Sequence, residues 1–242
     1  MALPFRAKRG LLATLLAAAA ALFIALGVWQ VERRAWKLNL IAAVDRRVHA
    51  APQPAPGPAA WPGFSAEAET YTSVQASGTF LNDRETLVQA VTELGPGFWL
   101  LVPLRTDEGW TVLVNRGFVP PNRVNPETRP DGVPAVHATV TGLLRAPEPG
   151  GAFLRGNDSG ANRWFSRDVA TIAAARGLGP VAPYFIDANA TPNLGGFPIG
   201  GLTVVAFRNS HLVYAFTWFG LAALCLGGLW FLLTGRVERE KA

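Results

Sequence analysis

The chain has 242 residues, of which 50% are hydrophobic and only 16% are charged, and it carries a formal net charge of +5. The long middle segment, residues 32–208, is nearly neutral, with 16 basic and 15 acidic groups, so we expect no nucleic-acid partner. The only cysteine is Cys225, which excludes a disulfide framework and a CxxC redox pair.

Two apolar windows dominate the sequence. Residues 10–31 and residues 212–233 contain no charged side chain, and each window is long enough to cross the ~30 Å hydrocarbon core of a bilayer as a helix. The windows therefore predict two transmembrane helices. A cleaved signal peptide is the alternative for the first window, because basic residues precede it and small residues at 17–21 offer a cleavage site. The apolar run exceeds the ~7–15 residues of a signal-peptide core, which favours a retained span.

The basic residues near the two windows suggest an orientation. Arg6, Lys8 and Arg9 precede the first window and basic residues also follow the second, so the positive-inside rule places residues 1–9 and 234–242 in the cytoplasm. Three further basic residues just after the first window weaken this argument. Only nine residues precede the first window, too few for a mitochondrial transit peptide, so we expect the inner (plasma) membrane of a bacterium.

The segment after the first window changes character twice. Residues 32–49 lack proline and glycine and place apolar side chains four residues apart, which predicts a helical extension of the first span. Residues 50–63 contain five prolines in fourteen positions, a composition typical of a semi-rigid linker. Residues 64–211 then form the predicted periplasmic domain.

This domain is rich in short runs of Val, Thr, Leu and aromatic residues, separated by turn-forming residues. The runs predict strands over residues 71–80, 85–91, 98–106, 110–120, 135–147 and 183–189. The short connection "DEG" predicts a hairpin between the third and fourth strands, and Gly177 should end a helix over residues 168–176. The expected fold is a membrane α+β protein: two transmembrane helices flank an exported, mostly antiparallel β-rich domain.

A search for catalytic motifs finds little. His49, His137 and His211 lie far apart in the sequence, and no HExxH, GxSxG or P-loop spacing occurs, although a triad assembled in three dimensions stays open. The glycine-rich residues 195–201 predict an irregular turn with positive φ angles rather than a phosphate loop. The segment "NRWFSRD", residues 162–168, could form a ligand patch, but a capped helix start with paired charges is the favoured interpretation. We therefore expect no enzyme.

His211 differs from the other histidines because it stands where the second apolar window begins. Arg208 precedes it, and Tyr214 and Trp218 follow it at helical spacing on the same face. A neutral imidazole at this boundary could bind a metal at membrane depth.

A similar group of residues ends the first window. Trp29, Arg33 and Trp36 share a helical face, and Gln30 and Lys37 lie beside them. One interpretation is an aromatic belt with basic side chains reaching the lipid head groups. The other is a site for a flat, metal-centred molecule with two carboxylates, bound by a histidine, aromatic rings and arginines.

Several strings, taken in order along the chain, resemble one protein family. They are "LGVWQVERRAWKLNLI", "VLVNRGFVPPNRVNPETR", "NRWFSRD", "YFIDAN", "GGFPIGG" and "FRNSHLVYAFTW". The set resembles the Surfeit-locus (Shy-type) family of cytochrome c oxidase assembly factors. The serine at position 210 departs from the family pattern, in which Asn or Glu often stands beside the histidine.

The resemblance implies a non-enzymatic assembly factor that binds haem a as cargo and promotes its insertion into oxidase subunit I. It makes His211 the expected ligand of the haem iron. The other residues implied to bind the cofactor are Trp29, Gln30, Arg33, Trp36, Arg208, Tyr214 and Trp218. Implied partners are cytochrome c oxidase subunit I, haem a synthase and membrane lipid. Two alternatives stay open: a haem-free scaffold for assembly intermediates, and a periplasmic hydrolase anchored by two helices.

Overall fold

The computed structural model describes residues 4–132, 137–151 and 155–234. The chain divides into two compact units. One contains the first 43 residues and the residues after position 205, and the other is Val44–Val205.

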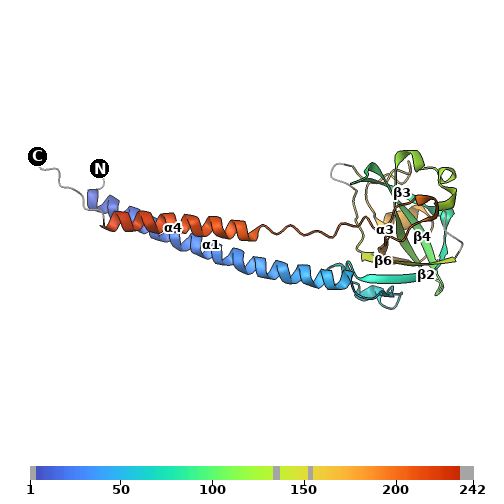
Figure 1. Cartoon of the computed structure of the whole chain (residues 1–242), viewed down its shortest axis with the longest axis horizontal. Helices are drawn as coiled ribbons and strands as arrows, with labels where there is room; N and C mark the ends of the chain where they lie inside the picture. Colours follow the sequence, from blue (N-terminus) through green and yellow to red (C-terminus); the bar gives the residue numbers. More distant parts are fainter. Residues whose placement is uncertain (1–3, 133–136, 152–154, 235–242) are drawn as a thin grey trace, which may run out of the picture. The chain divides into compact units, whose positions relative to one another are not determined.

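The first unit is a pair of long helices that lie side by side (Figure 1). Helix α1 (Phe5–Val48) is unbroken over 44 residues, including residues 32–48 where the sequence suggested a helical extension, and α4 (His211–Thr234) has 24 residues. Each is long and apolar enough to cross a membrane, and only 11% and 6% of their apolar windows are buried, unlike a core helix of a soluble domain. At 1.5 Å per residue, α1 is ~66 Å long, about twice what a ~30 Å hydrocarbon core requires.

The two helices meet along a regular seam. Their least exposed positions alternate at intervals of four and three residues, the spacing of a coiled-coil interface. On α1 these are Ala13, Leu16, Ala20, Phe23, Gly27 and Gln30, and on α4 they are His211, Ala215, Trp218, Ala222 and Cys225. Every second position in each set is Ala or Gly over most of the seam, and small residues of this kind allow two helices to approach closely.

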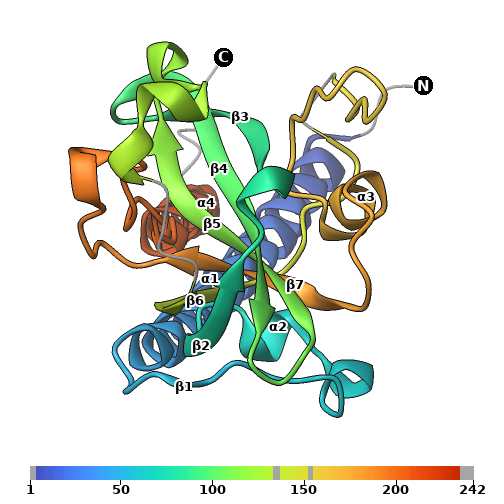
Figure 2. The same ribbon diagram turned by 90° about the vertical axis from the view of Figure 1, so that its right-hand side faces the viewer.

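The second unit is built on seven strands, which can be followed in Figure 2. They are β1 (Gln53–Pro54), β2 (Ser73–Phe80), β3 (Thr86–Thr92), β4 (Gly95–Thr106), β5 (Thr111–Val119), β6 (His137–Arg145) and β7 (Val181–Ala188). Their order is β1-β2-β6-β7-β5-β4-β3, and β2 also pairs with β4. The path β2-β6-β7-β5-β4-β2 therefore closes a five-stranded barrel. A Cβ on Gly78 would lie 2.1 Å from the Arg105 carbonyl oxygen, so only glycine permits this close crossing of β2 and β4.

The barrel has one core inside and a second outside. Alternate residues of β5 and β7, such as Val112, Val114 and Tyr184, fill the interior. The intervening residues Leu113 and Phe185 pack outward, beneath α3 (Val169–Ala175) and Trp164. Both faces of β5 are therefore covered, which explains why all nine of its residues are buried.

The predicted strands all appear within a few residues of their expected positions, and β4 and β5 form the expected hairpin. The Asp168 side chain caps α3 by accepting from the Thr171 N–H, and Gly177 ends it at a φ of +59°. The sheet is mixed but mostly antiparallel, as expected, and its two parallel pairings are β5 with β7 and β1 with β2. These parallel neighbours lack the short hairpin connections that sequence patterns reveal.

The proline-rich segment 50–63 also differs from the expected linker. Its strand β1 lies along β2, and the Ala55 N–H donates to the Gln75 carbonyl. Trp61, in the 3-10 turn Trp61–Gly63, packs edge-on against Trp110 of the barrel. Proline tolerates such an edge position because its missing N–H faces away from the ladder. The segment therefore covers an edge of the sheet, and the short helix α2 (Ala66–Glu69) follows it.

Candidate functional site

His211 and Gln30 form a polar contact within the apolar helix pair. His211 is the first residue of α4, and Gln30 is buried on the seam face of α1. Their Nδ1 and Oε1 atoms are 2.7 Å apart. Because an amide oxygen only accepts hydrogen bonds, Nδ1 carries the hydrogen, and Nε2 of the neutral ring carries a free lone pair. The pair therefore presents an imidazole nitrogen suited to a metal.

The surroundings of His211 fit a prosthetic group better than a bare ion. Among the described residues, no group of three or more His, Cys, Asp or Glu side chains lies together as a metal site. A single imidazole suits an iron whose other positions are filled by a porphyrin. Two residues before His211, the buried Oδ1 of Asn209 has no hydrogen-bond partner within the described chain. Buried acceptors are seldom left unpaired, so this oxygen fits a donor that the chain itself does not provide.

Aromatic rings and a lysine lie on the same side of the pair. Trp218 stacks on Phe23 with ring centroids 5.6 Å apart and planes 26° from parallel. Lys37 places its ammonium 5.2 Å from the centre of the Phe207 ring. The first contact joins α1 to α4 and the second joins α1 to the segment before α4, and together they combine apolar faces with a cation that could meet a carboxylate.

A second polar cluster belongs to the β domain. The carboxylate of Asp187, only 3% exposed, accepts hydrogen bonds from four side chains of different segments. The donors are Asn115 at 2.7 Å, Arg145 at 2.7 Å, Arg167 at 3.2 Å and Thr203 at 2.9 Å. These four hydrogen bonds connect Asp187 to β5, to β6, to the residue before the cap of α3 and to the chain after β7.

The charges of this cluster are balanced. Glu148 accepts from Arg167 at 2.9 Å and lies 3.5 Å from Arg145, so two arginines face two carboxylates. Burial alone would lower the pKa of Arg167, but the hydrogen-bonded Glu148 and the charge of Asp187 outweigh it and raise that pKa. A neutral, internally satisfied network of this kind stabilises the structure. Arg167 and the capping Asp168 therefore fit the helix-start interpretation of "NRWFSRD".

The two remaining histidines lie on the surface. His49 is beside Asp45, and the Nε2 atom of His137 is 2.9 Å from an oxygen of Asp107. In the described part of the chain, neither ring hydrogen-bonds a serine or a cysteine. These contacts therefore provide no nucleophile–base pair for a hydrolase.

Comparison with known proteins assigns the family. The SURF1 family model matches residues 17–223, which include the whole barrel, α1 from residue 17 onward and the first half of α4. The chain belongs to the SURF1 family. Surfeit locus protein 1 of Homo sapiens is 38% identical over 223 residues, covering 85% of this chain and 72% of that protein. Its counterpart in Takifugu rubripes is 33% identical, with coverage of 85% and 90%. A SURF1-like protein of Drosophila melanogaster is 35% identical, with coverage of 82% and 69%.

SURF1 is the family of cytochrome c oxidase assembly factors that the sequence motifs resemble. In this SURF1 protein, the motif residues at the end of the first apolar window and those at the start of the second do not form one common surface. His211, Gln30 and Trp218 meet on the seam, whereas Trp29 and Trp36 are 52% and 47% exposed on another face of α1. The Arg33 guanidinium carbon lies 3.9 Å from the centre of the Trp36 ring, so these residues form a separate exposed patch.

The remaining expected residues are also exposed. Tyr214 is 55% exposed, and Arg208 lies in the irregular segment before α4. Motif spacing did not single out Phe23 and Phe207, which contact Trp218 and Lys37. The four- and three-residue spacing of Ala20, Phe23, Gly27 and Gln30 could have identified the buried face of α1 before the structure was known.

Proposed function

We propose that this SURF1 protein holds haem a through His211 and promotes its insertion into subunit I of cytochrome c oxidase. In this proposal both helices span a bacterial inner membrane, both termini are cytoplasmic, and the β domain is periplasmic. The length and apolarity of α1 and α4 support the spans. The protein acts without catalysis, as a carrier for cargo that is poorly soluble and redox-active.

The contact between His211 and Gln30 carries the proposal. Its geometry keeps the proton on Nδ1, so Nε2 is available to the iron without a prior change of tautomer. A lone axial imidazole forms a bond that can be exchanged for ligands of the acceptor. Asn209, two residues before His211, would offer its unpaired Oδ1 as an acceptor for a polar substituent of the cargo.

The other residues have distinct proposed roles. Trp218 and Tyr214 provide ring surface for the macrocycle, and Arg208 and Lys37 provide cations for the propionates. The exposed patch of Trp29, Arg33 and Trp36 does not face the seam. Its contribution to haem binding stays a prediction, and contact with lipid head groups is the alternative. Haem a synthase is the proposed donor of the cargo, and subunit I is the proposed acceptor.

The test is the absorption spectrum of the full-length protein purified from cells that make haem a. We expect wild type and a His49→Ala control to carry haem a, and His211→Ala to lose most of it. Equal haem content in wild type and His211→Ala would refute the ligand assignment. Haem-free wild-type protein, together with poor oxidase assembly in a deletion strain, would instead establish the scaffold alternative.

A further inference from the structure

A buried arginine stands at one open end of the barrel. Val112, Val114 and Arg116 occupy successive inward positions of β5, and the third lies where the interior opens to solvent. Arg116 is only 7% exposed. It borders an open pocket of about 200 Å³, together with Phe80 of β2, the start of β6 and the end of β7. The mouth of a barrel is a common place for a ligand.

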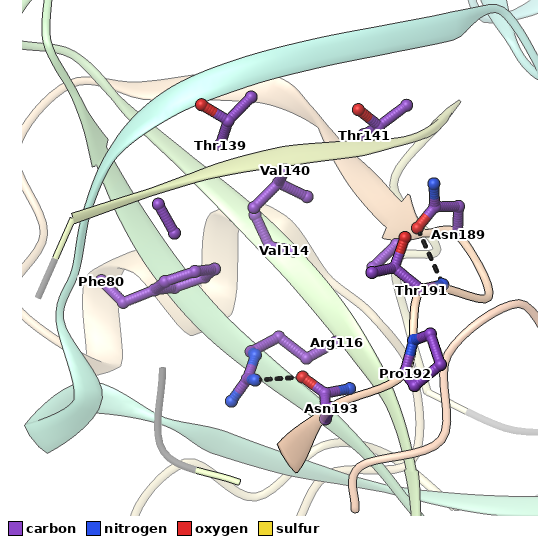
Figure 3. Close-up of a pocket in the computed structure, with 12 residues that line it drawn as sticks. Phe80, Val114, Arg116, Thr139, Val140, Thr141, Asn189, Thr191, Pro192 and Asn193 are labelled. Atoms are coloured by element: carbon purple, nitrogen blue, oxygen red, sulfur yellow. Dashed lines mark hydrogen bonds between the residues drawn. The ribbon is translucent and has the colours of Figure 1, made fainter. Parts of the chain in front are cut away.

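The contacts of Arg116 leave its charge without a direct partner. One terminal nitrogen donates to the Gly132 carbonyl at 2.6 Å and the other to Asn193 Oδ1 at 2.5 Å. Both acceptors are neutral, and the guanidinium also lies 5.4 Å from the Phe80 ring centre. A guanidinium has five N–H donors, and among the described residues only these two acceptors receive them. In Figure 3 the guanidinium spans the pocket and is joined by a dashed line to Asn193.

The nearby carboxylate does not compensate this charge. Glu85 is already paired with Arg129, whose terminal nitrogen is 2.6 Å from Glu85 Oε1. Two buried guanidinium groups therefore share one carboxylate in the described part of this region. Burial first, and then the charge of Arg129, lower the pKa of Arg116 to about 10, although Glu85 acts in the opposite direction. An anion in the pocket would relieve this imbalance.

The walls of the pocket indicate which anion fits. Val114 and Val140 point into the space beside Phe80 (Figure 3). Polar residues also line the pocket: Thr139, Thr141, Asn189, Thr191 and Asn193. One planar guanidinium matches one carboxylate, and the apolar part of the wall, formed by Phe80, Val114 and Val140, suits a short chain of methylene groups. Phosphate sites more often combine several cations with backbone N–H groups, and the pocket shows a single cation.

We propose that the barrel mouth binds a single carboxylate carried on a short aliphatic chain. The source is either an acidic side chain of a partner protein or a small free carboxylate. The site lies wholly within the β domain, so the outcome of its test does not depend on haem binding at His211.

Two variants separate this role from a purely structural one, in which Arg116 only anchors the segments of Gly132 and Asn193. Arg116→Met removes the charge. Ala138→Leu adds bulk to the pocket wall and keeps Arg116 with both of its hydrogen bonds, so it stays informative if Arg116→Met fails to fold. Ala174→Leu, on the exposed side of α3, adds the same bulk elsewhere.

The experiment titrates the full-length protein in detergent with propionate, followed by saturation-transfer NMR. Propionamide tests the need for charge, and inorganic phosphate tests the class of anion. We expect saturable propionate binding that weakens at least about tenfold in Arg116→Met and Ala138→Leu, persists in Ala174→Leu, and is absent for propionamide. The proposal would be overturned if wild type and Ala138→Leu bound propionate with equal affinity. It would also be overturned if the wild type bound phosphate more tightly than propionate, or showed no saturable propionate binding.

A second arm distinguishes the two sources. The probes are the capped peptide acetyl-Gly-Glu-Gly-amide and its Gln counterpart. Tighter binding of the Glu peptide than of propionate would identify a partner's acidic side chain as the ligand. Weaker binding of the Glu peptide would identify a free carboxylate. Equal binding of the Glu and Gln peptides would overturn the role of the carboxylate.

Discussion

Gln30 and His211 are 181 positions apart in the chain, yet Oε1 of the first lies 2.7 Å from Nδ1 of the second. The seam between α1 and α4 brings them together, and the glutamine determines which ring nitrogen of the histidine carries the proton. The proposed ligand is therefore oriented by a residue on the other helix.

Replacing Gln30 tests this orientation. Gln30→Leu keeps the volume but removes the acceptor, and we expect haem a affinity to fall about tenfold, as for other ligand-orienting hydrogen bonds. The electron paramagnetic resonance signal of the ferric haem should also broaden, because the ring is no longer held in one orientation. Gln30→Glu retains an acceptor, so it should restore the affinity for haem a and lower the reduction potential of the haem. The control is Val31→Leu, on the exposed face of α1. Unchanged affinity and spectra in Gln30→Leu would contradict the assignment.

Gly27 tests the packing of the seam. A Cβ at this position would lie 2.5 Å from the Phe219 ring, so the larger side chain of Gly27→Leu must displace this ring or separate the helices. We expect a loss of about 1–3 kcal/mol in helix pairing, measured by energy transfer between dyes on the two helices in detergent under increasing denaturant. Gly220→Ala on α4 is the control, since nothing lies within 4 Å of its added methyl group. Shortening Phe219 to Ala should restore pairing in the Gly27→Leu background, and failure to do so would locate the clash elsewhere.

Asp187 tests the ion-pair cluster of the β domain. Asp187→Ala leaves two buried guanidinium groups, Arg145 and Arg167, with Glu148 as their one remaining carboxylate, so we expect the free energy of unfolding to fall by about 3–5 kcal/mol. Thr203→Val removes one neutral donor and should cost about 1 kcal/mol. Urea unfolding followed by tryptophan fluorescence measures both changes. The control is Asp107→Ala, which breaks the exposed pair with His137 and should cost only about 0–1 kcal/mol. A similar loss of stability in Asp107→Ala and Asp187→Ala would refute the stabilising role of the buried cluster.

Because the Tyr184 hydroxyl is buried, we predict that the stability of the β domain depends on pH. Burial raises the pKa of its hydroxyl well above the usual value of 10.0, and the hydroxyl donates to the Pro56 carbonyl at 2.5 Å. Above pH ~10 the unfolded chain releases this proton while the folded chain keeps it. The stabilising contribution is therefore complete below pH ~10 and declines as the pH rises further.

The comparison with Tyr184→Phe isolates this group. At pH ~8 the variant should be about 1 kcal/mol less stable, because the hydrogen bond to Pro56 is lost. Above pH ~10 its stability should decline less steeply than that of wild type in urea unfolding. Identical slopes for the two proteins in this range would show that Tyr184 ionises normally in the fold.

The local elements of the fold were predictable, whereas their long-range arrangement was not. Alternating apolar residues and the "DEG" turn revealed β4 and β5, and Asp168 and Gly177 revealed the ends of α3. The parallel pairing of β5 with β7 joins segments separated by more than 60 residues, and no local pattern encodes it. The proline-rich segment was predicted to be a linker, and β1 within it was missed, because composition indicates a stiff chain but does not show which sheet edge the chain covers.

The candidate site was predicted in part. Helical spacing grouped His211, Tyr214 and Trp218, of which His211 and Trp218 lie on the seam while Tyr214 is 55% exposed. It also grouped Trp29 with Arg33 and Trp36, and the Arg33 side chain does contact the Trp36 ring. The spacing could not show which face of α1 meets α4: the face with the small residues Ala20 and Gly27 does so, whereas Trp29 and Trp36 are exposed. Gln30 lies on the selected face and reaches His211, whereas Trp29, one position earlier, does not.

The closed barrel has a consequence for how the protein is made. Strand β2 pairs with β6, and β7 lies between β6 and β5, so the ring cannot close until residue 188 has been synthesised and has joined the domain. Until then the nascent chain carries strands with unpaired edges, and such edges invite association with other chains. The many distant pairings also predict slow folding. Production of this protein should therefore depend on chaperones that shield residues 73–119 while the last strand is still being delivered.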